Sequence, residues 1–146
     1  MDPKVSCSAD TVEGQGLAAI PGQARALFLE PNAVSVATVN GSGSPRVTPL
    51  WVDIEGDHIL LNGTDAREWL RNLRRNPEVA LSIFDPQHIY RHVNVVGRAV
   101  EFSEEGAQEH IQKLARKYTG GPYAGPLQER RVMVKIRPDL VSLREG

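Results

Sequence analysis

The chain has almost no cysteine and no long apolar run. Cys7 is the only cysteine among 146 residues, so no disulfide can form within the chain, and nothing in the cysteine usage indicates an oxidising compartment. No stretch approaches the roughly 18 consecutive apolar residues of a membrane-spanning helix. The first residues also lack an apolar segment of signal-peptide length. We therefore predict a cytoplasmic protein with no membrane partner.

An excess of charge of either sign is also missing. The chain has 17 Lys and Arg residues against 18 Asp and Glu residues, which gives a formal net charge of -1. A general nucleic-acid-binding protein usually carries a marked basic excess. We therefore expect no nucleic-acid partner, and any cationic site must be local.

Several catalytic signatures are absent as well. The four histidines, His58, His88, His92 and His110, show no metal-site spacing, so we predict no metal site. The serines show no G-x-S-x-G elbow, and the glycines of "NGSGSP" open no helix that could form a dinucleotide fingerprint. The acidic residues Asp53, Glu55 and Asp57 are interpreted as a solvated hairpin end, with cation binding as the weaker alternative.

The remaining sequence predicts one domain. Residues 1–19 are polar and without periodicity, which is typical of a mobile arm, so the domain is placed at residues 20–146. Its β-branched and alternating segments predict six strands, at residues 33–40, 45–54, 58–62, 77–85, 90–102 and 130–143. Apolar residues at helical spacing predict short helices within 22–32, 64–77 and 103–121. The expected fold is mainly β with short helices (α+β), an antiparallel six-stranded split β-barrel.

Two details of these elements are predicted from single residues. Gly97 interrupts the long strand at 90–102, so we expect a bulge or bend there. Ser103 precedes two acidic residues and is the expected N-cap of the helix within 103–121.

The stretch "TDAREWLRNLRRNP" at 64–77 holds four arginines. Thr64 or Asp65 is the expected helix cap, and Asp65 with Glu68 resembles a capping box. At 100° per residue one face carries Arg67, Arg71, Arg74 and Arg75, and another carries Ala66, Trp69, Leu70 and Leu73. A solvated cationic face is the simpler interpretation. The alternative is an anion site, because Arg67 lies in the predicted first turn, where backbone N–H groups also attract anions.

The order of the motifs resembles that of a known family. The segments are "SPRVTPLWVDIEGDHILLNGTDAREWLRNLRRNPEVALSIFDP", "YRHVNVVGRAVEF", "LARKYTGGPY" and "RRVMVKIRPDLV", which together span roughly residues 24–143. They resemble the pyridoxamine-phosphate-oxidase-like split β-barrel family, and within it the flavin and deazaflavin oxidoreductases typical of actinobacteria. The ordered set carries the resemblance, especially the "G-x-P-x-x-x-P-L-W" strand pair followed by "R-N-L-R-R-N-P".

The resemblance implies a homodimer with cofactor grooves between the protomers. Members of this group commonly bind the deazaflavin coenzyme F420, and relatives use FMN, FAD or haem. The resemblance places the cofactor's ring against Val47, Thr48 and Pro49. It brings Tyr90 and Arg91 of the other protomer to the same groove.

The phosphate of the cofactor is expected where the third strand ends and the arginine-rich helix begins. The resemblance assigns Asn62, Thr64, Arg67 and the position of Trp69 to it, with Asn72 in support.

One departure from the family pattern concerns this phosphate site. Related sequences usually show "R-x-K-x-R-N-L", whereas this chain has "R-E-W-L-R-N-L", so Trp69 replaces a lysine and Glu68 adds a negative charge. Tryptophan offers only an indole N–H and a stacking face, so phosphate affinity should fall. The indole either stacks on a cofactor ring or fills the core.

The implied activity is hydride transfer from F420 or a flavin to a small electron-poor acceptor such as an enone, imine or quinone. The catalytic residue is left unknown, with Thr48, Tyr90 or a water as weak candidates for the proton donor. The alternatives are an FMN- or FAD-using relative, or a carrier that binds a flavin, F420 or haem without turnover. Pyridoxamine phosphate oxidation is a weaker third reading.

Overall fold

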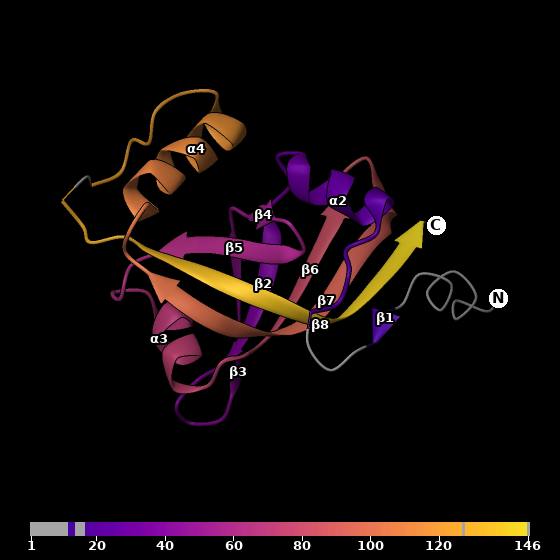
Figure 1. Cartoon of the computed structure of the whole chain (residues 1–146), viewed down its shortest axis with the longest axis horizontal. Helices are drawn as coiled ribbons and strands as arrows, with labels where there is room; N and C mark the ends of the chain where they lie inside the picture. The colour runs from indigo at the N-terminus through magenta and orange to yellow at the C-terminus, as the bar shows by residue number, and fades with distance from the viewer. Residues whose placement is uncertain (1–11, 14–16, 127, 146) are drawn as a thin grey trace.

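The fold is a single antiparallel sheet with three helices around it (Figure 1), seen in a computed structural model that describes residues 12–13, 17–126 and 128–145. The strands are β1 (Val12–Glu13), β2 (Val34–Val39), β3 (Pro45–Leu50), β4 (Asp53–Glu55), β5 (His58–Gly63), β6 (Glu78–Asp85), β7 (His88–Ser103) and β8 (Val132–Glu145). Seven of them follow in the order β3-β2-β6-β7-β8-β5-β4, and β1 pairs with β8. The mainly β, pyridoxamine-phosphate-oxidase-like fold predicted from the sequence is confirmed.

The predicted strand at 45–54 is divided in the structure, which accounts for one of the two strands beyond the predicted six, the other being β1. Its first part, β3, pairs with β2, whereas its second part, β4, pairs with β5. Between them the Val52 N–H donates to the Tyr118 hydroxyl at 3.1 Å, and the Val52 carbonyl accepts from Lys117 Nζ at 2.7 Å. These side chains take the place of ladder partners. The chain thus passes from one end strand of the sheet to the other, and the sheet is not closed.

The long strands β7 and β8 pair over most of their length and form the centre of the sheet. The predicted irregularity near Gly97 is confirmed, because the register shifts between Val96 and Gly97. Glycine is required there, since a Cβ atom at residue 97 would lie 2.5 Å from the Arg137 carbonyl oxygen. At the bulge the backbone of β7 thus approaches that of β8 too closely for any side chain at residue 97.

The helices are α2 (Gly22–Leu29), α3 (Glu68–Arg75) and α4 (Ala107–Thr119), each within a predicted range. Their predicted starts are wrong for α3 and α4. Arg67 is the N-cap of α3 and no side chain caps it, because the Asp65 carboxylate instead accepts from Arg74 Nε at 2.7 Å. The helix α4 begins after Gly106, which has a φ of 79°, while Ser103 is still part of β7.

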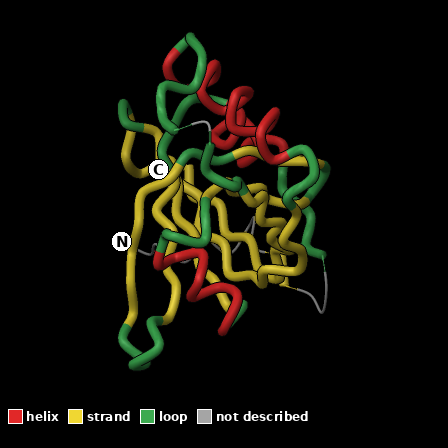
Figure 2. Tube along the Cα trace, turned by 90° about the vertical axis from the view of Figure 1, so that its left-hand side faces the viewer, coloured by secondary structure: helices red, strands yellow, loops and turns green. Residues whose placement is uncertain are grey.

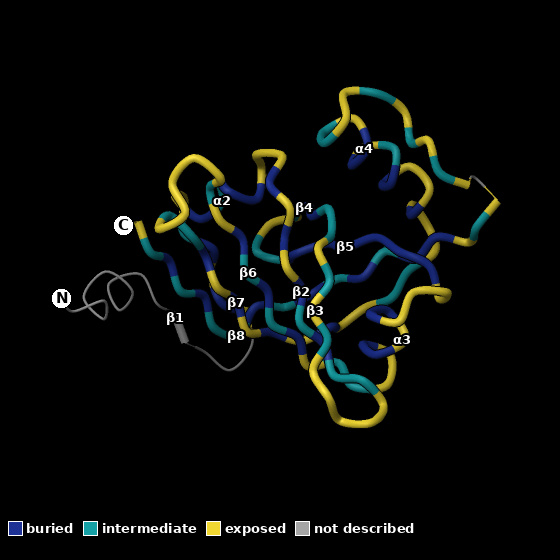
Figure 3. The backbone as a smooth tube through the Cα atoms, turned by 180° about the vertical axis from the view of Figure 1, so that it is seen from behind, coloured by how far each residue is buried: buried dark blue, intermediate teal, exposed yellow. Residues whose placement is uncertain are grey.

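The helices lie around the sheet (Figure 2), and the core cluster is formed by the inner face of the sheet together with α2 and α3 (Figure 3 shows the buried segments). Buried and exposed residues alternate along β2 and the middle of β7, as expected for strands with one face on the core. Leu27 and Phe28 of α2 and Leu70 and Leu73 of α3 are fully buried in the same cluster. Among the described residues, no helix is both long and apolar enough to cross a membrane.

The predicted N-terminal arm is described only in part. Val12–Glu13 form β1 on the edge of β8. Ala18 is buried, and its N–H donates to the Pro138 carbonyl at 2.7 Å. The other residues of the arm up to residue 16 lie outside the described residues.

Candidate functional site

A pocket of about 450 Å³ lies where β3, the end of β5, the start of α3 and α4 meet. Its lining residues are Ala33, Thr48, Pro49, Leu50, Trp51, Asn62, Gly63, Arg67, Trp69, Ile111, Leu114, Tyr123 and Arg131. The lining includes both tryptophans of the chain and two arginines, and none of these described lining residues is an acid. Such a surface suits a ligand that is flat and negatively charged.

The four arginines of the α3 region have different surroundings. Arg71 donates to the Asp65 carbonyl, and Arg74 pairs with the Asp65 carboxylate. Arg75 donates to Asn72 Oδ1 at 2.6 Å. Only Arg67 of the four lines the pocket, and its exposed side chain has no polar partner among the described residues. Three of the four arginines therefore already have partners in Asp65 and Asn72. Arg67 is the one of the four that is available to a ligand in the pocket.

Trp69 both fills the core and forms part of the pocket wall. Its side chain is only 3% exposed and belongs to the core cluster. The ring packs directly on Gly63, where a Cβ atom would lie 2.5 Å from Trp69 Cζ2. Glu68, the other departure from the family pattern, points to Arg46, with Oε2 2.5 Å from Nη2. Its negative charge is thus paired outside the pocket lining.

Trp51 forms another part of the wall and is held by α4. Its ring stacks on Tyr118 with the centroids 5.3 Å apart and the planes 5° from parallel. The Tyr118 hydroxyl donates to the Asn32 carbonyl at 2.7 Å. Burial raises the pKa of Tyr118, so this hydroxyl keeps its proton and remains a donor.

Arg131 and Tyr123 complete the polar side of the pocket. Arg131 Nε donates to Asn62 Oδ1 at 2.9 Å, and Nη1 donates to the Tyr123 hydroxyl at 3.1 Å. The Arg131 guanidinium also lies 5.1 Å from the centroid of the Tyr123 ring. These two residues come from the segment between α4 and β8 and from its junction with β8, so the pocket joins segments far apart in the sequence.

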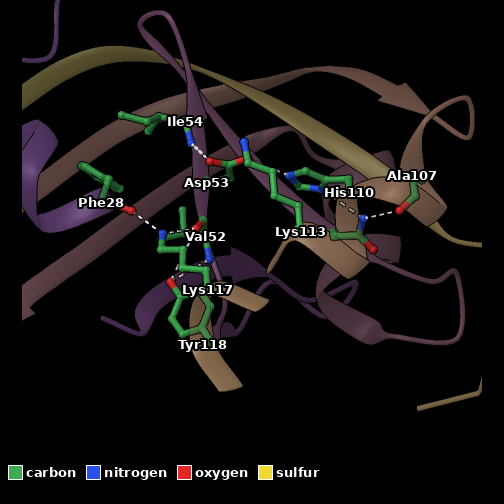
Figure 4. Close-up of polar contacts among 10 residues, drawn as sticks. Phe28, Val52, Asp53, Ile54, Ala107, His110, Lys113, Lys117 and Tyr118 are labelled. Atoms are coloured by element: carbon green, nitrogen blue, oxygen red, sulfur yellow. Dashed lines mark hydrogen bonds and ion pairs between the residues drawn. The ribbon is translucent and has the colours of Figure 1, made fainter. Parts of the chain in front are cut away.

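A buried polar cluster lies behind this wall (Figure 4). Asp53 Oδ2 is 3.1 Å from His110 Nε2 and 2.9 Å from Lys113 Nζ, and Asp53 Oδ1 accepts from the Ile54 N–H. Burial alone would raise the pKa of Asp53, but the hydrogen bonds from His110, Lys113 and Ile54 outweigh it and hold that pKa well below its usual range. The interpretation of Asp53 as a solvated hairpin residue is wrong, because its carboxylate is buried and fully engaged.

Some of the predicted site residues lie at the pocket and some do not. Thr48, Pro49, Asn62, Arg67 and Trp69 line it. Thr64 directly follows the lining residue Gly63, and its buried hydroxyl has no hydrogen-bond partner among the described residues.

The other four predicted residues are not among the lining residues. Val47 is 67% exposed on the opposite face of β3 from Thr48, as alternation along a strand requires. Asn72 donates to Thr38 Oγ1 and Asn40 Oδ1, so it fastens α3 to β2 and the turn after it. Tyr90 is 59% exposed at the start of β7, and Arg91 pairs with Asp85.

Comparison with known proteins identifies the family. The sequence matches the pyridoxamine 5'-phosphate oxidase family over residues 20–145. The chain belongs to this family. A search of the curated proteins found no match.

Solved structures agree with this assignment. A solved F420 reductase is 30% identical and superimposes with a TM-score of 0.74, over 81% of this chain and 94% of that one. A conserved hypothetical protein of Mycobacterium tuberculosis is 21% identical with a TM-score of 0.70, over 91% and 89%. HupZ of Group A Streptococcus is 21% identical with a TM-score of 0.59, over 82% and 94%. The last two likenesses show the fold alone, whereas the first supports a family of flavin- or F420-type oxidoreductases.

Sequence reasoning missed Trp51, Tyr123, Arg131 and His110. Trp51 and Arg131 lie within predicted strands and within the motifs that carry the resemblance, but the resemblance assigned neither of them to the cofactor site. His110 was considered only as a metal ligand, and among the described residues no group of His, Cys, Asp or Glu could hold a metal ion. The signal that could have revealed His110 is its place on the apolar stripe of its helix, one residue before Ile111, because a histidine buried there needs a polar partner.

Proposed function

We propose that this protein is an oxidoreductase that binds coenzyme F420 in the pocket beside Trp51 and Trp69 and passes hydride to a small electron-poor organic acceptor. The observation that carries the proposal is the lining of the pocket, which combines two indole rings and two guanidinium groups with no acid. That combination suits a planar ring joined to a phosphate. The 30% identity to a solved F420 reductase supports the choice of F420, with FMN and FAD as alternatives.

The residues of the pocket would bind and orient rather than react. Trp51 and Trp69 would pack against the ring, and Thr48 on β3 would contact its edge. Arg67 and the unpartnered Thr64 hydroxyl would meet the phosphate, since both offer donors that no described residue uses. The cofactor would supply the hydride, so no strongly perturbed acid or base is required in the pocket.

The proposal includes a homodimer. The outer face of the sheet carries an apolar row that runs across five strands in register, formed by Val47, Ala37, Ala80, Val96 and Leu140. A second copy of the chain would cover this face. It would also bring its own Tyr90 and Arg91 toward the groove, as the family resemblance implies.

The first experiment is a titration of the purified protein with F420, FMN and FAD, followed by tryptophan fluorescence. Both tryptophans line the pocket, so an occupied pocket should change the emission directly. Arg67→Gln should weaken binding of the phosphate-bearing cofactors about tenfold, which corresponds to about 1.4 kcal/mol. Arg71→Gln is the matched control, because it removes an arginine of the same helix that already donates to the Asp65 carbonyl.

Turnover is then measured with the chemically reduced cofactor and a quinone acceptor. Repeated turnover supports the oxidoreductase, while cofactor exchange without turnover would identify a carrier. If none of the three cofactors binds at micromolar concentration, the proposed function is wrong.

A further inference from the structure

Arg131 is a buried cation in the pocket wall with little negative charge to balance it. Its side chain is only 8% exposed, and a guanidinium stays protonated in proteins. Buried charges normally have a close counter-ion, because desolvation without one is costly. Among the described residues its one ion-pair partner is Glu129, whose Oε2 lies 3.9 Å from Nη1 and which is itself partly exposed. The charge of Arg131 is therefore only loosely compensated.

Two neutral acceptors hold the guanidinium plane of Arg131. Asn62 Oδ1 accepts from Nε, and the Tyr123 hydroxyl accepts from Nη1. No described residue accepts from Nη2, although Arg131 lines the pocket. The group is thus fixed in orientation while it keeps donors for a further acceptor.

The orientation of Asn62 is set by its own partners. Its Nδ2 group donates to the Ala107 carbonyl at 2.9 Å and lies 3.1 Å from His110 Nδ1. Because Arg131 can only donate, Asn62 Oδ1 must face it, so Nδ2 must donate to His110 Nδ1. His110 then carries its proton on Nε2 and donates it to Asp53. One hydrogen-bonded chain thus runs from Asp53 through His110 and Asn62 to Arg131 (Figure 4 shows its Asp53 end).

We infer that Arg131 is the main oxyanion-binding residue of the pocket, and that His110, acting through Asn62, positions it. The inference deepens the proposed function and rests on it for the identity of the ligand. Arg67 is exposed and its charge is screened by water and salt, whereas Arg131 acts from a drier wall where its interaction with an anion is stronger.

The test compares ligands with and without the phosphate. FMN and riboflavin differ only in the phosphate, and F420 is compared with its ribityl deazaflavin precursor, which lacks both the phosphate and the acidic tail. Inorganic pyrophosphate is the third probe, and binding of each is followed by tryptophan fluorescence. Arg131→Gln should weaken FMN or F420 about 30-fold or more and its phosphate-free counterpart less than about threefold. Arg131→Lys should recover part of the loss. Arg116→Gln, on the exposed face of α4, is the control and should bind like the wild type.

Two results would overturn the inference. One is that Arg131→Gln binds the phosphate-bearing ligand as tightly as the wild type. The other is that the variant loses affinity equally for the phosphate-bearing ligand and its phosphate-free counterpart, which would indicate a structural role for Arg131. If no flavin or F420 binds the wild type, the proposed function fails. The inference about Arg131 is then tested by pyrophosphate binding alone. Saturable binding that depends on Arg131 supports the inference, and its absence overturns it.

His110 is tested by the contact it makes. His110→Asn can still accept from Asn62 Nδ2, whereas His110→Phe cannot. The asparagine variant should therefore keep most of the preference for phosphate-bearing over phosphate-free ligand, and the phenylalanine variant should lose it. Equal preference in both variants, with folding verified by thermal unfolding, would contradict a positioning role.

Glu129→Gln provides a test of opposite sign. It removes the one carboxylate paired with Arg131, so binding of the phosphate-bearing ligand should tighten about threefold or more. A variant that merely disturbed the fold would bind the ligand more weakly, so tighter binding cannot arise from structural damage. Unchanged or weaker binding would count against Arg131 as the residue that holds the oxyanion.

Discussion

Gly63 and Trp69 show how one small residue shapes the pocket wall. Gly63 is the last residue of β5, and its φ does not lie in the left-handed region. Glycine is required instead for space, because the indole ring of Trp69 occupies the volume where a side chain would begin. The sequence left open whether Trp69 stacks on a ligand or fills the core. In the structure the same ring is part of the core and of the pocket lining.

Gly63→Ala should destabilise the protein by about 1–3 kcal/mol, because the Trp69 ring would have to shift within a packed core. The shift should also change tryptophan emission and weaken ligand binding in the pocket. Urea unfolding measures the stability change. Gly22→Ala is the control, because a Cβ atom there meets nothing within 4 Å. Equal stability of wild type and Gly63→Ala would show that the ring moves freely.

At the scale of elements, α4 binds the link between β3 and β4, where the chain leaves one end strand of the sheet for the other. Lys117 Nζ donates to the carbonyls of Phe28 and Val52, so one side chain of α4 joins the end of α2 to the link between β3 and β4. Burial lowers the pKa of Lys117 to about 8, and the charge of Lys113 adds to this effect while Asp53 opposes it. The side chain that attaches the helix, Lys117, therefore titrates in a range of pH that is accessible to experiment.

The contribution of Lys117 to stability should rise with pH between about 8 and its ordinary value of 10.5. In that range the unfolded chain keeps a proton that folded Lys117 has lost, so stability increases as the pH increases. Urea unfolding at pH 7.5 and 9.5 should show a rise of about 1 kcal/mol in wild type relative to Lys117→Met, a figure reduced for the partial exposure of the group. Lys135→Met keeps Lys117 and should keep the rise. A constant difference between wild type and Lys117→Met would contradict the prediction.

The elements themselves were largely predictable, and their ends were not. β-Branched alternation located the strands, and the apolar stripe of "REWLRNLRR" located α3. The predicted capping box does not form, because the Asp65 carboxylate pairs with Arg74, nine residues later, instead of capping the helix. Likewise the strand at 45–54 reads as continuous, since the acceptor and donor that break it, Tyr118 and Lys117, come from a helix more than 60 residues later.

At the scale of the whole molecule, the outer face of the sheet is the feature without a partner in the single chain. The apolar row ends at Val47, which is 67% exposed, and includes Val96, which is 53% exposed. A contiguous apolar surface of this kind is typical of an interface. It lies on the opposite side of the sheet from the core, so a second copy could cover it without any change of fold.

Val96→Arg should convert the proposed homodimer into a monomer of 16.0 kDa, because it would place a charge within the apolar row, where burial in the interface would desolvate it at a large cost. Light scattering at several concentrations measures the mass. Leu29→Arg is the control, since it places the same charge at an exposed apolar residue of α2, away from the row. A wild-type protein that is monomeric at every concentration would exclude the homodimer.

The sequence by itself determined the class of fold, the family and five of the thirteen residues that line the pocket. Strand alternation and helix periodicity are local properties, and the ordered motifs carry the family. The family resemblance assigned five residues to the site that do line the pocket, namely Thr48, Pro49, Asn62, Arg67 and Trp69. Tertiary structure alone decided the polar wall. Arg131 and Asn62 are 69 residues apart, and Asp53 and His110 are 57 apart. Their burial and partners depend on how the sheet and α4 fold together, which no local pattern records.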